Sequence, residues 1–373
     1  MRNSNYSSNF SRFFTSLPDP RRTNKGNYLY PLEEIVFLVV SAVVSDAKSW
    51  EQLRVFAETK LDWLKQFYPY THGIPSADVL ERLFARLDTD KFNHCFINWV
   101  NDQLENLSED LIALDGKTAK GSDHKSMNSP ALHMVSAFAT TQKITLGQVA
   151  VDQKSNEITA IPKLLDLLTI KDCVISIDAM GCQKEIAKQI RKQEADYVLQ
   201  VKSNQQQLLD EISNVFTVTS IQSKDEQHDF GHGRIEFRAC SVITDLSFLD
   251  EKVHWKDIKS IIKLDRKTIE KQTSKERIQS SYFISSAKFT AQKFNHLIRK
   301  HWAIENNLHW SLDVLFKEDH SLKKKGNSAQ NFNIITKMAL SMVENESTPK
   351  MSRIGKMKKC AYDDHFREIV LFS

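Results

Sequence analysis

The chain has 373 residues, of which 41% are hydrophobic and 26% charged, and its net charge is +4. These values describe an ordinary globular protein with room for two or three domains, and the mild positive charge permits nucleic-acid binding without requiring it. The five cysteines are dispersed without a C-x-x-C pair, which excludes a zinc ribbon and fits reduced thiols in a cytoplasmic protein. The longest apolar run, residues 35–44, has about half the length of a membrane span. We therefore expect a buried helix there and no membrane partner.

The first third of the chain reads as an arm followed by a helical domain. Residues 1–26 are rich in Ser, Asn, Arg and aromatic residues without periodicity, which predicts a flexible N-terminal arm. Residues 27–108 predict a small all-helical domain, because Ser49, Ser76 and Asp90 each precede an amphipathic stretch as helix caps do. Gln52 is placed to complete a capping box with Ser49.

The middle of the chain has the pattern of an α/β domain. Over residues 109–216 the pattern is strand, strand, strand, helix, strand, helix, strand, with an interruption expected at Pro162 in the first helix. Residues 217–289 predict a β-rich insertion. A long helix is expected within residues 290–325, followed by a helical, mildly basic C-terminal segment over 326–373.

The long helix places a carboxylate where an apolar residue is expected. At helical spacing one face carries Leu297, Ile298, Trp302, Glu305, Leu308, His309, Leu312 and Phe316. A buried, unpaired carboxylate costs several kcal/mol or takes up a proton. Glu305 therefore needs a partner from elsewhere in the chain.

Two aspartates have matching contexts upstream. Asp115 and Asp178 each end an apolar run and precede a small residue. Ligands of α/β sheets gather just beyond strand ends, although Asp115-Gly116 alone could equally be a simple turn. Together with Glu305 the two aspartates would repel one another unless they bound divalent cations, and oxygen ligands suit Mg²⁺ or Mn²⁺. Two such ions, roughly 3.5–4 Å apart, can clamp the attacking and leaving oxygens of a phosphodiester.

From about residue 17 to 340 the chain resembles a known family. The segments that carry the resemblance include LDGKTAKGS, IDAMGCQKEIA, ADYVLQVKSNQQQL, GHGRIEFR and HWAIENNLHWSLDVLFKED. They are similar to the H-repeat-associated DDE transposases of bacterial insertion sequences. A broader group of related transposases carries Tyr, Arg and Lys around the helix glutamate, and this chain has Ile298, His301 and Leu312 there.

The resemblance implies a fold, a metal site and a reaction. The fold is a ribonuclease H-like core, and Asp115, Asp178 and Glu305 match the metal-binding triad, with two ions of Mg²⁺ or Mn²⁺. The substrates are double-stranded DNA at the terminal inverted repeats and at the target, which the enzyme cleaves and joins. We expect a homodimer in the DNA complex, with the helical domain as the candidate for end recognition.

Several further residues are candidates for contacting DNA. Lysines near strand ends and aromatic residues near the metals meet phosphates and bases in such proteins, although solvated loops and core packing are the plainer interpretations. The candidates are Lys117, Lys202, Arg234, His301, Trp302, His309, Lys323, Lys324 and Lys325.

Three other interpretations stay open from the sequence. His301, Glu305 and His309 could form a zinc site, which would leave both aspartates unexplained. The chain could be a metal-dependent nuclease that cuts without joining. It could also be a decayed or domesticated transposase that only binds DNA.

Overall fold

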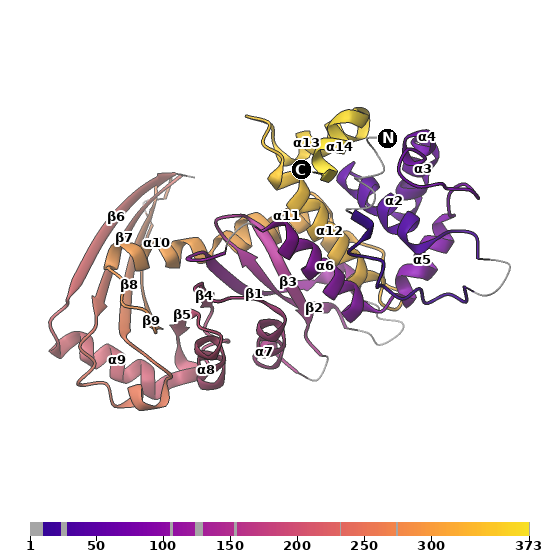
Figure 1. Cartoon of the computed structure of the whole chain (residues 1–373). Coiled ribbons are helices and arrows are strands. Elements are labelled where there is room, and N and C mark those ends of the chain that lie inside the picture. The colour runs from indigo at the N-terminus through magenta and orange to yellow at the C-terminus, as the bar shows by residue number, and fades with distance from the viewer. Residues whose placement is uncertain are drawn as a thin grey trace.

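The structure is a computed structural model, and it describes residues 10–23, 28–104, 107–123, 130–152, 155–231, 233–273 and 275–372. A single nine-stranded sheet runs through the molecule in the order β3-β2-β1-β4-β5-β9-β8-β7-β6 (Figure 1). The strands are β1 (Leu111–Ala119), β2 (Leu132–Ala139), β3 (Ile144–Ala150), β4 (Val174–Ile177), β5 (Asp196–Val201), β6 (Ser223–Gly231), β7 (Arg234–Ile243), β8 (Ser260–Glu270) and β9 (Glu276–Ser285).

The sheet is mixed, and it joins two regions that the sequence analysis kept apart. β1 pairs antiparallel with β2 and parallel with β4, and β4 pairs parallel with β5. The predicted β-rich insertion extends the same sheet, because β9 pairs antiparallel with β5. Strand β6 was missed, since its sequence SKDEQHDFG has no apolar alternation, and it pairs only with β7 at the edge of the sheet.

Helices lie on both faces of the sheet. The helices α7 (Glu157–Leu167), α8 (Lys184–Lys192) and α9 (Gln206–Val218) contribute side chains to the large core cluster, together with Ile112, Ile175 and Leu199 of the central strands. On the opposite face α10 (Ala291–His301) buries Phe294 and Leu297 in a second cluster with alternate residues of the same strands. Pro162 does not interrupt α7, which continues through it. The mixed α/β class predicted from the sequence is confirmed.

The N-terminal helices follow the predicted capping signals closely. They are α2 (Leu32–Val44), α3 (Trp50–Thr59), α4 (Leu61–Leu64), α5 (Ala77–Arg86) and α6 (Thr89–Gln103). Ser49 and Gln52 form the expected capping box, and Ser76 caps α5. Asp88, rather than the predicted Asp90, caps α6 by accepting from the backbone of Lys91. None of the helices in the described ranges is both long and apolar enough to span a bilayer.

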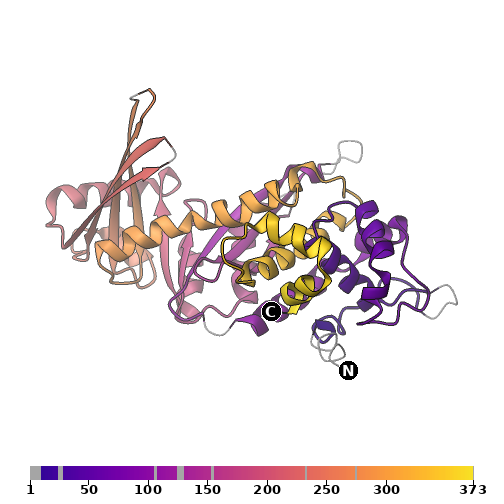
Figure 2. The same cartoon turned by 90° about the horizontal axis from the view of Figure 1, so that it is seen from above.

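The C-terminal helices pack into this helical region instead of forming a separate segment. They are α12 (Ser328–Asn345), α13 (Arg353–Tyr362) and α14 (Asp364–Phe372), and they lie beside the N-terminal helices in both views (Figures 1 and 2). Asn331 of α12 donates to the carbonyls of Phe84 and Leu87 at the end of α5. Phe37 of α2 stacks on Phe372 of α14 with ring centroids 6.3 Å apart.

Part of the expected N-terminal arm is packed. Phe10, Phe14 and Leu17 are buried, and the Phe14 ring lies 6.0 Å from that of Phe92 in α6. The prediction of a flexible arm is therefore wrong for residues 10–17, because three apolar side chains anchor them. Residues 1–9 and 24–26 of that arm lie outside the described residues.

Candidate metal centre

The two aspartates lie side by side just beyond the parallel pairing of β1 with β4, Asp115 within β1 and Asp178 directly after β4. Pairing of β1 with β4 ends at Leu114 and Ile177, and Asp115 and Asp178 are the next residues on the two strands. Adjacent strands lie about 4.8 Å apart, and residues in equal register project from the same face. Both carboxylates therefore start from neighbouring positions on the face that α10 covers.

Gly116 has a packing role and does not mark a turn. Strand β1 continues through Gly116 to Ala119, paired with β2. A Cβ at position 116 would lie 2.1 Å from Glu157 Oε1 and 2.6 Å from His133 Nε2. These two side chains contact each other at 2.7 Å directly against the strand. The turn interpretation of Asp115-Gly116 is wrong, because the glycine makes room for this pair within the strand.

Glu305 lies in a π-helical segment, η5 (Ile304–His309), between α10 and α11 (Trp310–Val314). Figure 2 shows the three elements following one another as one long helix across the sheet. A π-turn inserts an extra residue, so the 3.6-residue period does not continue through it. The prediction that Trp302 and Glu305 are buried is wrong: the Trp302 residue is 52% exposed and the Glu305 side chain 49%.

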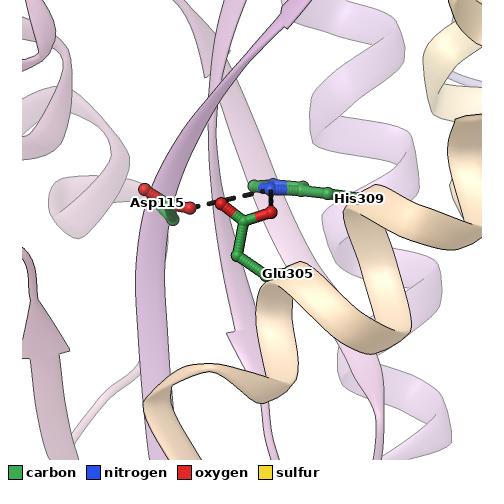
Figure 3. A group of neighbouring side chains, drawn as sticks. All are labelled: Asp115, Glu305 and His309. Carbon is green, nitrogen blue, oxygen red and sulfur yellow. Dashed lines mark ion pairs between the residues drawn. The ribbon is translucent and has the colours of Figure 1, made fainter. Parts of the chain in front are cut away.

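Asp115, Glu305 and His309 converge on one point from β1 and η5 (Figure 3). His309 Nδ1 lies 3.2 Å from Glu305 Oε2 and 3.6 Å from Asp115 Oδ2. One potential ligand atom from each of the three residues lies within 4.8 Å of the other two. His309 Nε2 is buried and has no hydrogen-bond partner among the described residues. The three side chains form a group that could hold a metal ion.

The pKa values of the two carboxyl groups in this site are shifted in opposite directions. Burial, and then the neighbouring Glu305 carboxylate, raise the pKa of Asp115 to about 8. The hydrogen bond from His309 lowers the pKa of Glu305. These shifts favour a proton on the more buried Asp115 over one on Glu305, and a divalent cation would replace such a proton.

Asp178 stays close to this group without joining it. Its Oδ1 accepts from the backbone N–H groups of Met180 at 3.0 Å and Gly181 at 3.5 Å. Two residues earlier on the same face, Ser176 Oγ lies 2.9 Å from His301 Nδ1. Burial lowers the pKa of His301 to about 4, although Asp178 and Glu305 oppose the shift. A neutral imidazole thus sits between these two carboxylates. Because it faces Ser176, it does not complete the alternative His301–Glu305–His309 zinc site.

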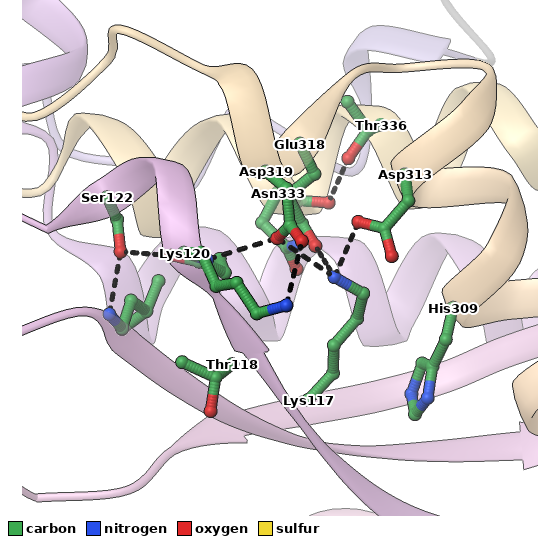
Figure 4. Close-up of polar contacts among 12 residues, drawn as sticks. Lys117, Thr118, Lys120, Ser122, His309, Asp313, Glu318, Asp319, Asn333 and Thr336 are labelled. Carbon is green, nitrogen blue, oxygen red and sulfur yellow. Dashed lines mark hydrogen bonds and ion pairs between the residues drawn. The ribbon is translucent and has the colours of Figure 1, made fainter.

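Lys117 is held by carboxylates and does not face solvent as a phosphate-binding residue would. Its Nζ lies 2.8 Å from Asp313, 2.9 Å from Glu318 and 3.6 Å from Asp319 (Figure 4). Burial opposes the charged form, but these carboxylates raise the pKa of Lys117 to about 12. The ammonium group fastens the chain after α11 to strand β1, two residues from Asp115.

The lysine run at 323–325 is only partly exposed. Lys323 is buried, with its Nζ 3.8 Å from the centre of the Phe332 ring and bonded to the Lys48 carbonyl. The prediction that Lys323 contacts DNA is wrong, because the rings of Phe332 and of Trp50, which is distant in sequence, cover its ammonium group. Lys324 is half-buried and Lys325 is exposed, 3.8 Å from Glu81.

The other DNA-contact candidates differ in exposure. Lys202, Arg234 and Trp302 are exposed and line one large cavity. His309 is 4% exposed and His301 half-buried, and both point toward carboxylates or Ser176. These two histidines belong to the carboxylate site and not to an open surface.

A buried lysine beside the site was missed by the sequence analysis. Lys337 of α12 donates to Ser136 Oγ at 2.7 Å and to Gln148 Oε1. Ser136 pairs with Asp115 across β2 and β1, and Gln148 pairs with Ser136 across β3 and β2. Burial lowers the pKa of Lys337 to about 7. The sequence of α12 did not predict this burial, because a single lysine among apolar residues is usually expected to reach solvent.

Comparisons with known proteins give a consistent result over nearly the whole chain. Residues 106–342 match the family model described as "Transposase DDE domain", and residues 11–100 match "DDE_Tnp_1-associated". The "H repeat-associated putative transposase YhhI" of Escherichia coli K12 is 39% identical, covering 95% of each chain. The "Putative transposase YncI" of Escherichia coli O157:H7 is 38% identical, covering 97% of this chain and 94% of its own.

Proposed function

This chain belongs to the H repeat-associated family of DDE transposases, and from this premise we propose that it cuts and joins DNA at the ends of an insertion sequence. The observation that carries the proposal is the convergence of Asp115 and Glu305, with Asp178 at the adjacent strand end. Divalent cations would offset the repulsion between Asp115 and Glu305 and would draw in Asp178 from the adjacent position.

Asp115, Asp178 and Glu305 hold the cations, which are Mg²⁺ or Mn²⁺ and number two. Cations held there would supply Lewis acidity, which would lower the pKa of an attacking water or hydroxyl and offset the charge on a leaving oxygen. Asp115 gives up its proton as the cations bind, and His309 keeps the Glu305 carboxylate directed toward Asp115. His309 is a positioning residue in this scheme.

The reaction has two steps at the same site. In cleavage, a water oxygen attacks the phosphorus at the end of the element, and the bond to the 3′ oxygen breaks to leave a 3′-hydroxyl. In joining, that hydroxyl attacks a phosphorus of the target, forms the new phosphodiester and displaces the target's 3′ oxygen. Both steps transfer a proton and need no cysteine or covalent enzyme intermediate.

The rest of the molecule has a place in this proposal. The antiparallel β3-β2-β1 strands, followed by parallel β4 and β5 between helical layers, support a ribonuclease H-like core. The helical region formed by α2–α6 and α12–α14 recognises the terminal inverted repeats. Two ends must be cut together, so the working complex contains two copies of the chain.

The test is a Mg²⁺-dependent assay on inverted-repeat DNA that scores both nicking and joining to a target plasmid. We expect both products from the wild type and from Asp250→Ala, an exposed control outside the helical region and the carboxylate site, and neither from Asp178→Ala. Nicking without joining identifies a nuclease, and binding without nicking identifies a DNA-binding descendant of a transposase. Equal nicking by wild type and Asp178→Ala would overturn the assignment of the metal site.

A further inference from the structure

A large groove lies between the long helix and the outer half of the sheet. It has a volume of about 1140 Å³ and is lined by α10 and η5 on one side and by β6–β9 on the other. In Figure 1 the strands β6–β9 curve and extend past α10. Trp302, Ala303, Asn306 and Asn307 line the groove and flank Glu305 in sequence on both sides. The groove therefore runs along the segment that carries Glu305.

The sheet face that lines the groove changes character along each strand. On β7, Val242 and Cys240 are buried beneath α10 in the second apolar cluster. Further along the same face, Arg238, Glu236 and Arg234 line the groove. The inner half of this face therefore serves packing, and the outer half is polar without a helix to cover it.

The groove carries an excess of positive charge. Six cationic side chains and two carboxylates line it: Lys202, Arg234, Arg238, Arg266, Arg299 and Lys300 against Asp229 and Glu236. The carboxylates pair with Arg299 and Arg238. Lys202 and Arg234 are exposed and form no ion pair with any described residue. This charge is complementary to a polyanion.

Exposed aromatic side chains accompany the cations. Trp302 is 52% exposed at the end of the groove nearest Glu305, and Phe230 is 66% exposed at the tip of β6. A cationic groove with exposed aromatic rings is the combination that binds single strands, because phosphates meet the cations and bases stack on the rings. A fully paired duplex would leave no base free for Trp302.

We propose that this groove binds an unpaired stretch of the DNA strand adjoining the phosphodiester at Glu305. The phosphates lie along Lys202, Arg234 and Arg266, and a base stacks on Trp302. The proposal rests on the proposed function for the identity of the polyanion, and it assigns the outer half of β6–β9 as part of the substrate site.

The test measures binding of the full-length protein to fluorescent 20-nucleotide single strands and to duplexes, by anisotropy, without divalent cations so that no cleavage occurs. Lys202→Gln combined with Arg234→Gln is compared with Lys163→Gln combined with Lys188→Gln, which removes the same charge from exposed sites outside the groove. Loss of two phosphate contacts lowers the slope of log K against log salt by about 1.4 for single strands. The control pair leaves the slope near the wild-type value.

Trp302→Ala and Trp310→Ala provide a second matched pair, because Trp310 is 53% exposed on the same long helix but does not line the groove. We expect Trp302→Ala to weaken single-strand binding about fivefold or more, and Trp302→Phe to restore most of it. Equal changes in single-strand binding by the two double lysine/arginine variants, or by the two tryptophan variants, would overturn the proposal that this groove binds DNA. So would a loss confined to duplex binding, or no DNA binding by the wild type.

These results are independent of the reaction. If the groove variants lose single-strand binding while the wild type neither nicks nor joins DNA, the groove's role in single-strand binding is supported and the proposed function is wrong. If the groove variants cut and join DNA normally and their single-strand binding is unchanged, the groove's role in single-strand binding is wrong and the proposed function is supported.

Discussion

At the scale of single residues, Asp115 shows how the fold prepares a metal site. Strand β1 buries its carboxyl group beside Glu305, and the result is a pKa raised to about 8. A carboxyl whose pKa is higher in the folded than in the unfolded protein stabilises the fold less as pH rises from about 4 to about 8. The site is therefore least stable, and most receptive to a cation, at the upper end of this range.

This argument predicts a pH-dependent effect of Mg²⁺ on stability. Saturating Mg²⁺ should raise the melting temperature by a few degrees at pH 8.5, corresponding to about 2–3 kcal/mol at a concentration of ~100 Kd. The rise should be smaller at pH 6, because the proton on Asp115 competes. Thermal unfolding of the wild type and of Asp115→Asn measures this. The variant should be more stable than the wild type at pH 8.5 without metal and should lose the Mg²⁺ effect. A Mg²⁺ effect equal at both pH values would contradict the account.

The close packing around Gly116 predicts that a side chain at this position lowers the stability of the protein. Gly116→Ala should destabilise the protein by about 1 kcal/mol, because the new methyl group pushes the ends of the His133 and Glu157 side chains aside and breaks their hydrogen bond. Gly231→Ala is the control: its Cβ meets no atom within 4 Å, so its effect should stay within about 0.5 kcal/mol. Urea unfolding of the two variants gives the comparison, and equal stabilities would show that Gly116 has no packing role.

At the scale of elements, the π-helical segment η5 explains what the sequence could not predict about the site. Helical periodicity placed Leu308 and His309 correctly on the buried side, but it also placed Trp302 there. A single wider turn shifts the phase of the helix, and no residue type announces such a turn. The two aspartates were predictable because apolar runs ending in Asp mark where β1 and β4 lie, although β1 continues past Asp115 to Ala119.

The geometry of η5 depends on a distant arginine. Arg353 of α13 donates to Asn307 Oδ1 at 3.0 Å and to Ser311 Oγ at 2.9 Å, and it pairs with Glu344 of α12. We predict that Arg353→Ala weakens Mn²⁺ binding about tenfold, because Glu305 is then less firmly positioned. Lys358→Ala is the control, since this exposed lysine on the same helix pairs with Asp46 instead. Mn²⁺ titration followed by electron paramagnetic resonance measures both affinities. Unchanged binding by Arg353→Ala would show that η5 holds its shape unaided.

At the scale of the whole molecule, both ends of the chain build one helical region beside the sheet. The sequence analysis predicted the helices and their caps correctly, since those signals are local. It divided the chain into successive segments, because contacts such as those of Phe37 with Phe372 and of Asn331 with the end of α5 join residues far apart. The burial of Lys323 and Lys337 has the same origin, because Lys323 contacts Lys48 and Trp50, and Lys337 contacts Ser136, all in distant parts of the chain.

This arrangement predicts that the C-terminal helices are essential to the fold. Ending the chain after Glu346 removes the buried side chains of Met357, Phe366, Val370 and Leu371. Each contributes about 1.5–3 kcal/mol, so the sum approaches the stability of a typical protein. The shortened chain should lose its cooperative thermal transition, whereas Tyr362→Ala, at a position that is 81% exposed, should keep it. An unchanged transition in the shortened chain would mean that the C-terminal helices form an independent segment.

The central claim is that Asp178 acts with Asp115 and Glu305 as a ligand of catalytic cations. A metal-preference switch tests it most directly, because a thiolate at this position disfavours Mg²⁺ and accepts the softer Mn²⁺ better. The measurement is DNA cleavage by Asp178→Cys and by the wild type in Mg²⁺ and in Mn²⁺. The account predicts that the variant is inactive in Mg²⁺ and partly active in Mn²⁺, while the wild type works in both. Full activity of Asp178→Cys in Mg²⁺ would contradict it.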